Sequence, residues 1–165
     1  MKPLIVVAGV SGSGKSTIGI ELAGRLGIPF IDGDELHPDS NVQKMANGIP
    51  LDDEDRWPWL WRVGNSLREA EGTGLVIACS ALTRSYRQII LDAESRTRFV
   101  MLEGSPELLA SRLKKRQGHF MPPTLLGSQF ETLEELAPTE PGFTVSVTDS
   151  PTEIVDEIIE RLQAM

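Results

Sequence analysis

The stretch GVSGSGKS, residues 9–16, is the most informative segment of this chain of 165 residues. It fits the spacing G-x-x-x-x-G-K-[ST] and lies between a short apolar run, residues 4–8, and a segment with helical spacing, residues 15–26. Glycines let successive backbone N–H groups point inward, where together with a helix start they can hold phosphate oxygens. A chance glycine-rich turn would lack the strand before it and the helix after it. The stretch therefore predicts a nucleoside triphosphate site.

The side chains of this phosphate loop have separate expected roles. Lys15 is expected to neutralise the β- and γ-phosphates of ATP, and Ser16 is expected to offer its hydroxyl to Mg²⁺. The predicted ATP-binding residues of the loop are Gly9, Val10, Ser11, Gly12, Ser13, Gly14, Lys15, Ser16 and Thr17.

The rest of the chain alternates short apolar strands with helical segments. After the first strand at residues 4–8, further strands are expected at residues 28–32, 75–79, 98–102 and 144–147. Helices are expected at residues 15–26, 39–46, 52–70, 83–93, 106–116, 124–134 and 152–162. Pro58 marks either a bend in the longest helix or its true first turn. This alternation predicts one α/β domain over residues 1–165, with a five-stranded parallel sheet flanked by helices.

Composition limits the class of partner. Sixteen basic and 24 acidic residues give a net charge of −8, which argues against sequence-independent binding of nucleic acid but allows a small anionic substrate. The single cysteine, Cys79, cannot form an internal disulfide and is expected to serve packing in a reducing compartment. The first apolar run is too short for a signal peptide or a membrane span. We therefore expect a cytoplasmic protein that binds neither membrane nor nucleic acid.

The motifs around the loop indicate which class of nucleotide-binding protein this is. The sequence has neither an Asn/Thr-Lys-x-Asp guanine motif nor the signature loop of a transporter ATPase, which leaves the small kinases. The third strand ends in Cys79 and Ser80, where a Walker B aspartate often lies. Asp32 ends the second strand, and parallel strands bring their carboxyl ends beside the phosphate loop. Asp32 is therefore the candidate carboxylate for Mg²⁺.

Five blocks of the sequence resemble the short, thermoresistant-type gluconate kinases of the shikimate-kinase and nucleoside-monophosphate-kinase group. The blocks are GVSGSGKST, DGDELHP, KMANGIPLDDEDRWPWL, CSAL…YR and GHFMPPTLLGSQFETLE, and the resemblance covers nearly the whole chain. It implies a P-loop kinase fold with a small helical lid at about residues 117–137. It also implies ATP-dependent phosphorylation of D-gluconate at its 6-hydroxyl, giving 6-phosphogluconate and ADP. Thr83 stands where the family block has a lysine, and the neighbouring Arg84 can compensate for the lost charge.

The resemblance assigns the catalytic groups. By similarity to shikimate kinases, Asp32 serves Mg²⁺ through water, and Asp34 holds the acceptor hydroxyl and can take its proton. Asp34 lies two residues after Asp32 and shares its side if the strand pleat continues, although both carboxylates could instead cap the next helix. Arg112 and Arg116 belong to a basic run before the lid and are expected to close over the γ-phosphate. The alternative is a solvated basic face.

Gluconate carries a carboxylate, so its pocket needs a cation. Arginine matches a carboxylate in a bidentate fork, which favours Arg56 and Arg84, followed by Lys44. Each of these could instead be a surface charge or part of a structural ion pair. The other candidate substrate contacts are Ser80, His37 and His119. Either histidine could instead be a packed loop residue or part of the lid hinge. Two histidines without a cysteine pair argue against a zinc site.

The stretch WPWLW, residues 57–61, could stack on a sugar, but such aromatic spacing is more typical of a core or an interface. An exposed part of this helix could support a homodimer, as the resemblance also suggests. Competing functions are a kinase with another acceptor, such as shikimate, a nucleoside monophosphate or adenylylsulfate, and a non-catalytic ATP-binding sensor. The intact set of Lys15, Ser16, Asp32 and Asp34 speaks against the sensor.

Overall fold

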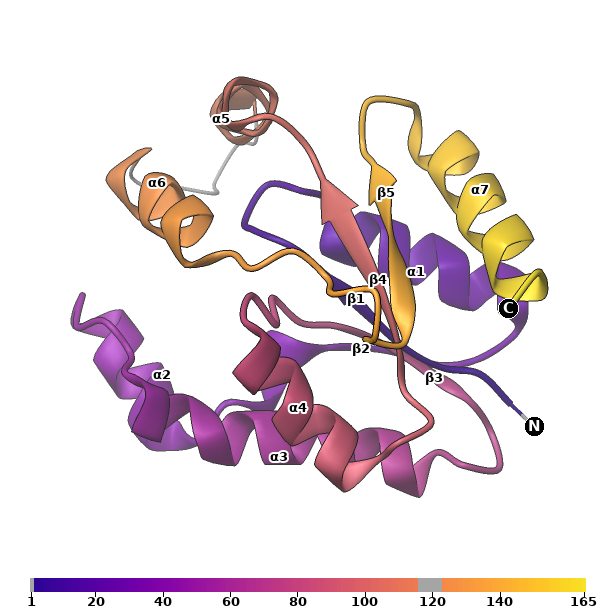
Figure 1. The fold of residues 1–165 in the computed structure, drawn as a ribbon. Helices are drawn as coiled ribbons and strands as arrows, with labels where there is room; N and C mark the ends of the chain where they lie inside the picture. The colour runs from indigo at the N-terminus through magenta and orange to yellow at the C-terminus, as the bar shows by residue number, and fades with distance from the viewer. Residues whose placement is uncertain (1, 116–122) are drawn as a thin grey trace.

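The computed structural model describes residues 2–115 and 123–165 (Figure 1). Within these residues five parallel strands form one sheet in the order β2-β3-β1-β4-β5, which confirms the predicted fold class. The strands are β1 (Leu4–Ala8), β2 (Phe30–Asp32), β3 (Leu75–Ala78), β4 (Arg98–Glu103) and β5 (Gly142–Ser146).

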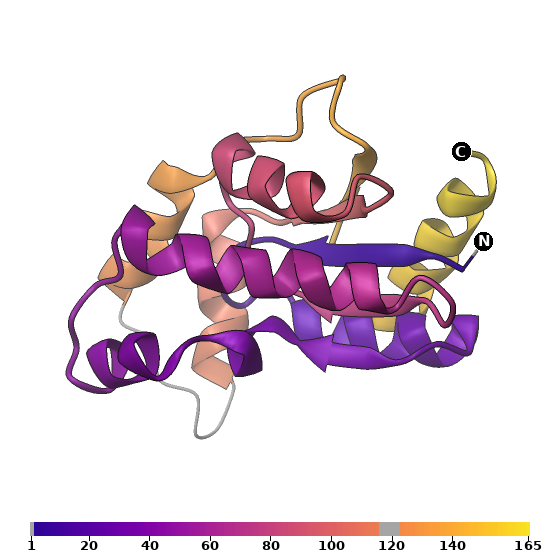
Figure 2. The same ribbon diagram turned by 90° about the horizontal axis from the view of Figure 1, so that it is seen from below.

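Helices cover both faces of the sheet. The helices are α1 (Lys15–Leu26), α2 (Asp39–Ala46), α3 (Asp53–Glu69), α4 (Arg84–Ala93), α5 (Pro106–Lys115), α6 (Pro123–Thr132) and α7 (Pro151–Gln163), with a 3₁₀ turn η1 (Gly33–Leu36). Figures 1 and 2 show α1 and α7 on one face and α3 and α4 on the other. Helices α5 and α6 lie beyond the carboxyl end of β4 (Figure 1).

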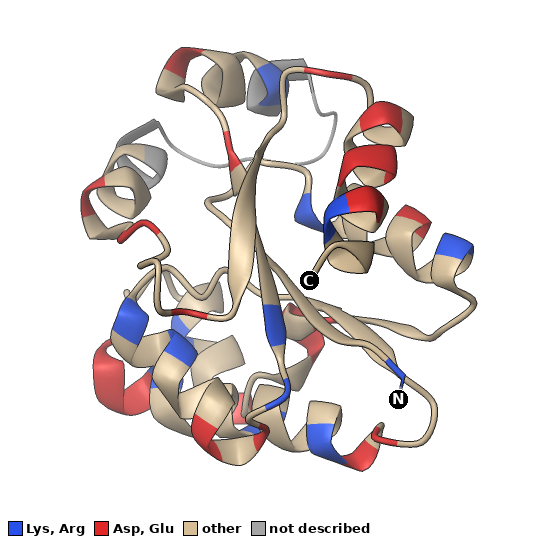
Figure 3. Cartoon of the chain, turned by 45° about the vertical axis from the view of Figure 1, so that its right-hand side comes forward, with Lys and Arg blue, Asp and Glu red and all other residues tan. Residues whose placement is uncertain are grey.

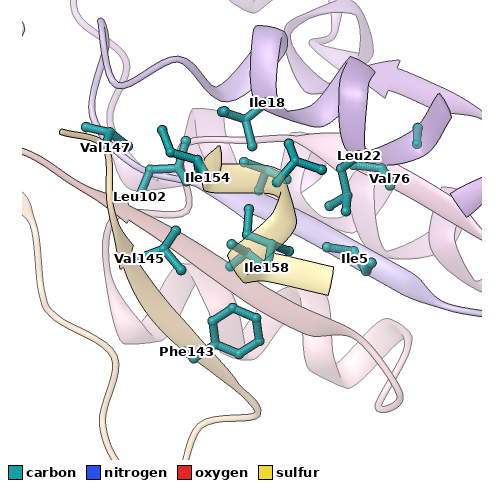
Figure 4. Packing of buried hydrophobic residues seen from close by; sticks show 14 of the residues in the cluster. Ile5, Ile18, Leu22, Val76, Leu102, Phe143, Val145, Val147, Ile154 and Ile158 are labelled. Atoms are coloured by element: carbon teal, nitrogen blue, oxygen red, sulfur yellow. The ribbon is translucent and has the colours of Figure 1, made fainter. Parts of the chain in front are cut away.

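The pleat of the central strand divides the core into two layers. Ile5 and Val7 belong to the cluster beneath α1 and α7, which Figure 4 shows, whereas Leu4 and Val6 belong to the cluster beneath α3 and α4. Successive side chains of a strand point to opposite faces, so a strand that is buried on both faces must be apolar throughout. This is why β1 stands out in the sequence as a continuous apolar run.

Two capped helix starts refine the sequence-based boundaries. Asp52 accepts a hydrogen bond from the backbone N–H of Asp55 at 2.8 Å, in a reciprocal capping box that starts α3 at Asp53. Pro58 therefore lies inside the helix, and the alternative that it forms the first turn is wrong. Thr83 accepts a hydrogen bond from the N–H of Tyr86 at 3.2 Å and so caps α4.

The sequence-based placement of Asp34 assumed that the strand pleat continues past Asp32. In the structure it does not continue. The Asp32 carboxylate accepts a hydrogen bond from the N–H of Asp34 at 3.0 Å, and the chain turns into η1. Gly33 allows this turn to pass close to β3, because a Cβ there would lie 2.4 Å from the carbonyl oxygen of Ala78. Asp34 is therefore presented by a 3₁₀ turn and not by an extended strand.

A buried arginine ties the segment after α6 to the loop between β3 and α4. Arg87 is fully buried and pairs with Glu140 at 2.7 Å. Its guanidinium also donates to the carbonyl oxygens of Ala81 at 2.8 Å and Glu134 at 3.0 Å. Ala81 has φ +40°, a conformation that residues with a side chain seldom adopt, so Arg87 stabilises this strained turn. Residues 117–122 of the predicted lid lie outside the described residues.

The charges of the described surface agree with the acidic composition. Figure 3 shows acidic and basic residues interspersed around the molecule, and α7 carries Glu153, Asp156, Glu157 and Glu160. Within residues 2–115 and 123–165, every helix is too short or too polar to cross a membrane.

Two helical glycines give a matched test of the packing between α3 and α4. A Cβ on Gly64 would lie 2.5 Å from the Cβ of Ala93 and 3.1 Å from the carbonyl oxygen of Ile90, whereas a Cβ on Gly24 in α1 would meet nothing within 4 Å. We expect Gly64→Ala to lower the free energy of unfolding by about 1–3 kcal/mol through overpacking. Gly24→Ala should raise it by about 0.5–1 kcal/mol through helix propensity. Urea denaturation of both variants measures the difference, and equal effects would contradict the close approach of the two helices.

Candidate active site

The phosphate loop joins β1 to α1 and is shaped by its own hydrogen bonds. Gly12 and Gly14 have φ values of 81° and 92°, which favour glycine, and Gly14 occupies the position before α1. The hydroxyl of Ser13 donates to the carbonyl oxygen of Val10 at 2.6 Å, and Lys15 Nζ donates to the same oxygen at 3.1 Å. The lysine is thus held over the loop, as a phosphate-binding lysine must be.

The loop and the two predicted carboxylates enclose one small cavity. The cavity has a volume of 130 Å³ and is lined by Ser11, Gly12, Gly14, Lys15, Ser16, Asp32, Asp34 and Ala78. Strand register explains the convergence, because Asp32 in β2 pairs with Ala78 in β3, which in turn pairs with Val7 at the end of β1. Asp34 therefore reaches the cavity although the pleat argument for it was wrong.

The donor set at this cavity fits Mg²⁺. The Ser16 hydroxyl donates to Asp32 Oδ2 at 3.3 Å, so two oxygen ligands lie side by side next to the loop. Mg²⁺ is usually held by one or two protein oxygens, with phosphate oxygens and water completing its octahedron. The part of the chain that the structure describes contains no group of three or more His, Cys, Asp or Glu side chains suited to a metal.

A second cavity lies on the other side of the loop, against the start of α7. Its volume is 310 Å³, and its lining residues are Gly12, Ser13, Gly14, Thr17, Ile18, Arg112, Asp149, Pro151 and Ile154. The Arg112 guanidinium donates to the carbonyl oxygen of Val147, which fixes it near this cavity. Asp149 and Pro151 were missed because the stretch before α7 indicated only a helix start. Arg116 lies outside the described residues.

A third and larger cavity opens between α3, the end of β3 and α6. Its volume is 630 Å³, and it is lined by Met45, Gly48, Ile49, Pro50, Leu51, Arg56, Ser80, Leu82, Tyr86, Ser128, Gln129 and Thr132. We call it the acceptor cavity. Two of the predicted substrate residues, Arg56 and Ser80, are part of its wall, and Arg56 is the one cation among the described lining residues.

Arg56 is held in the acceptor cavity by Tyr86 and Asp53. Arg56 Nη1 donates to the Tyr86 hydroxyl at 3.2 Å, and that hydroxyl donates to Asp53 Oδ1 at 2.6 Å. The guanidinium also lies 5.6 Å from the centre of the Tyr86 ring. Burial and the hydrogen bond to Asp53 raise the pKa of Tyr86, so its hydroxyl stays protonated. In the sequence, the YR pair of a family block is the one signal for this role.

The other two predicted cations do not line the acceptor cavity. Lys44 Nζ pairs with Asp55 at 2.8 Å, the structural ion pair that was its alternative, and this hydrogen bond raises the pKa of Lys44. Arg84 has an exposed side chain, and its backbone N–H donates to the Glu134 carboxylate at 2.8 Å. Their contact with substrate stays a prediction.

His37 is packed beneath η1. Its ring stacks on Trp59 with centroids 4.2 Å apart, and its Nδ1 hydrogen-bonds the Asn41 amide at 3.2 Å. Trp59 in turn donates to the carbonyl oxygen of Gly33 at 2.7 Å. His37 and Trp59 therefore support the turn that presents Asp34, and a direct substrate contact by His37 stays a prediction. His119 lies outside the described residues.

Thr83, which departs from the family block, has a local role here. Its hydroxyl caps α4 by accepting from the N–H of Tyr86. A lysine side chain has no acceptor and could not make this bond. At residue 83, this chain therefore has a cap for the helix that carries Tyr86 in place of the positive charge of the family lysine.

Gln129 is a site residue that the sequence analysis missed. Its side-chain oxygen accepts a hydrogen bond from the N–H of Ser11 at 2.7 Å, and the residue also lines the acceptor cavity. It lies in the block GSQFETLE, which carried the family resemblance without any role for a particular residue.

Comparison with known proteins identifies the family. The shikimate kinase family model matches residues 11–163. The chain is 47% identical to the gluconokinase of Gluconobacter oxydans over 99% of its own length and 94% of that protein. It is 42% identical to the thermoresistant gluconokinase of Escherichia coli over 97% of the chain and 93% of that protein. The crystal structure of a gluconokinase from Sinorhizobium meliloti superposes with a TM-score of 0.89 at 47% identity, covering 98% of this chain and 92% of that one.

The packing of His37 predicts a pH dependence of stability. Burial lowers the pKa of His37 below 6.5, so the unfolded chain binds this proton more readily than the folded chain does. The free energy of unfolding should therefore fall as the pH drops from about 7.5 to about 5.5. His37→Phe keeps a ring against Trp59 but cannot titrate, so it should show a smaller fall. Urea denaturation at both pH values tests this, and equal falls in both proteins would exclude His37 as the cause.

Proposed function

Since the chain belongs to the shikimate kinase family and, within it, to the gluconokinases, we propose how its residues transfer the γ-phosphoryl group of ATP to D-gluconate. The protein is a kinase, and its products are 6-phospho-D-gluconate and ADP. The observation that carries the residue assignment is the acceptor cavity beside the phosphate loop, with Arg56 in its wall. A sugar acid offers the carboxylate that this cation can bind.

ATP binding divides between two of the cavities. The phosphates bind to the loop N–H groups and to Lys15. The nucleoside occupies the cavity beside Arg112 and Asp149. Ser16 and Asp32 would hold Mg²⁺, with Asp32 acting directly or through water, and the ion would neutralise charge on the β- and γ-phosphates.

Asp34 serves the acceptor hydroxyl. It lines the small cavity with Lys15, so a hydroxyl beside it faces the terminal phosphate. The 6-hydroxyl oxygen forms a bond to the γ-phosphorus as the bond from that phosphorus to the β–γ bridging oxygen breaks, and the hydroxyl proton passes to Asp34. Lys15 stabilises the charge that moves onto the leaving ADP.

The acceptor cavity positions the other end of gluconate. Arg56, which Tyr86 and Asp53 hold in place, donates two parallel hydrogen bonds to the gluconate carboxylate. Ser80 forms a hydrogen bond with a hydroxyl of gluconate. Lys44, Arg84, His37 and His119 remain candidates for further contacts. Arg84 in particular needs a rearrangement, because it does not line the cavity.

A lid of about residues 117–137 completes the site. Its closure brings Arg116, the third predicted catalytic residue, to the γ-phosphate and excludes water that would compete as acceptor. Arg112 joins Arg116 there by leaving the carbonyl oxygen of Val147. The structure describes residues 123–137 of this lid, which include helix α6.

We further propose a homodimer and a cytoplasmic location, which exposed and buried apolar groups support. Trp57 and Trp61 are 50% and 45% exposed on the outer side of α3, a surface suited to a homodimer. Cys79 is buried and reduced, and burial raises its pKa to about 12, as in a structural thiol of a cytoplasmic protein.

An acceptor panel tests the function. ADP release should give kcat/KM for gluconate at least about 10²-fold above that for shikimate, AMP or adenylylsulfate, because a site built for a hydroxy acid leaves polar groups unpaired with other acceptors. Faster turnover of shikimate or AMP would overturn the gluconokinase assignment. ATP binding without ADP release on any acceptor would favour the sensor.

Asp34 can be tested with its neighbour as control. Asp34→Asn should lower kcat by about 10²–10⁴-fold, because the amide cannot accept the hydroxyl proton. Binding of a non-hydrolysable ATP analogue, measured by calorimetry, should stay within about twofold, since the loop and Asp32 are intact. Glu35→Gln removes an exposed carboxylate one residue away and should leave kcat unchanged. A wild-type kcat in Asp34→Asn would remove Asp34 from the mechanism.

A further inference from the structure

Gln129 joins the two cavities in which the reacting groups must meet. Ser11 lines the small cavity with Lys15 and Asp34, and Gln129 lines the acceptor cavity. The hydrogen bond of 2.7 Å from the Ser11 N–H to Gln129 Oε1 connects residues 118 positions apart in sequence. Gln129 therefore links the phosphate loop to the wall of the acceptor cavity.

Other hydrogen bonds hold the segment that follows α6. The segment after the helix is fixed by Glu134, whose N–H donates to the carbonyl oxygen of Leu82 at 2.8 Å and whose carboxylate accepts from the N–H of Arg84 at 2.8 Å. Arg87 donates to the Glu134 carbonyl oxygen and holds Glu140. A purely structural role for Gln129 would duplicate these contacts.

The chemistry of a carboxamide suits the place where the phosphoryl group passes. Ser11 N is a donor, so the atom facing it is the oxygen, and the NH₂ group lies within about 2.3 Å of that oxygen on the same planar carbon. An uncharged donor at this position can bind a phosphate oxygen. A carboxylate of the same shape could accept from Ser11 but would repel the phosphate and could donate nothing.

We propose that Gln129 is a further catalytic residue, whose carboxamide stays on the Ser11 N–H while its NH₂ group donates a hydrogen bond to the γ-phosphoryl group under transfer. The proposal rests on the proposed gluconokinase reaction. It adds to Lys15 a neutral donor that approaches the phosphoryl group from the acceptor side. It also explains why the wall of the acceptor cavity reaches back to the phosphate loop.

The test compares Gln129→Glu and Gln129→Ala with Gln163→Glu, a matched change on the exposed end of α7. Both Gln129 variants should lose about 10²-fold in kcat, the usual effect of removing one donor to a developing charge. The KM for gluconate should stay within about threefold, and the melting temperature within about 2 °C, because other contacts hold α6. Gln163→Glu should behave as wild type.

Several outcomes would overturn the proposal. A kcat within about threefold of wild type in Gln129→Glu would show that no donor is needed, and a raised KM with unchanged kcat would make Gln129 only an acceptor-binding residue. A large fall in melting temperature would make its role structural. Failure of wild type on gluconate would contradict the proposed function instead. In that case the rate of ATP hydrolysis without an acceptor still tests Gln129. We expect that rate to be about 10²-fold lower in Gln129→Glu and in Gln129→Ala than in wild type.

Discussion

Parallel pairing of the three strands β2, β3 and β1 is the constraint on which the site depends. The register sets Asp32 opposite Ala78 and Ala78 opposite Val7, so the ends of these strands lie at one level. Ser16 at the start of α1 can then reach the Asp32 carboxylate at 3.3 Å. A shift of one residue in β2 would turn Asp32 to the other face of the sheet and separate it from the loop. The apolar layers on both faces hold that register, which is how core packing determines the geometry of a polar site.

Polar contacts behind the site keep its loops in uncommon conformations. Trp59 and His37 support η1 from below, while Arg87 holds the turn at Ala81 between Ser80 and Leu82. Buried polar groups are costly unless they are paired, and each of these groups has a partner. Asp34 in the small cavity and the Ser80 side of the acceptor cavity are thus positioned from within the protein and not by the substrate.

The sequence predicted most of the architecture and the phosphate side of the site, because both rest on local patterns. A buried strand, a glycine loop and a helix are contiguous, and their chemistry can be recognised without knowing the fold. Asp34 lines the small cavity through the turn at Gly33 and not through a continued strand pleat, and this turn depends on the closeness of β3. Gln129 and Tyr86 could not be assigned, because their partners Ser11 and Asp53 are distant in sequence. Lys44 shows the reverse problem, since its ion pair with Asp55 cannot be distinguished in sequence from a free cation.

The attachment of the chain at Glu134 makes α6 a lever with its pivot just beyond the helix end. A helix of ten residues is about 15 Å long, and Gln129 lies about 6 Å from Leu133 along its axis. A tilt of about 20° would carry the far end of α6 through about 5 Å but would displace Gln129 by only about 2 Å. A tilt about this pivot therefore displaces Gln129 less than half as far as it displaces Pro123, the first residue of α6.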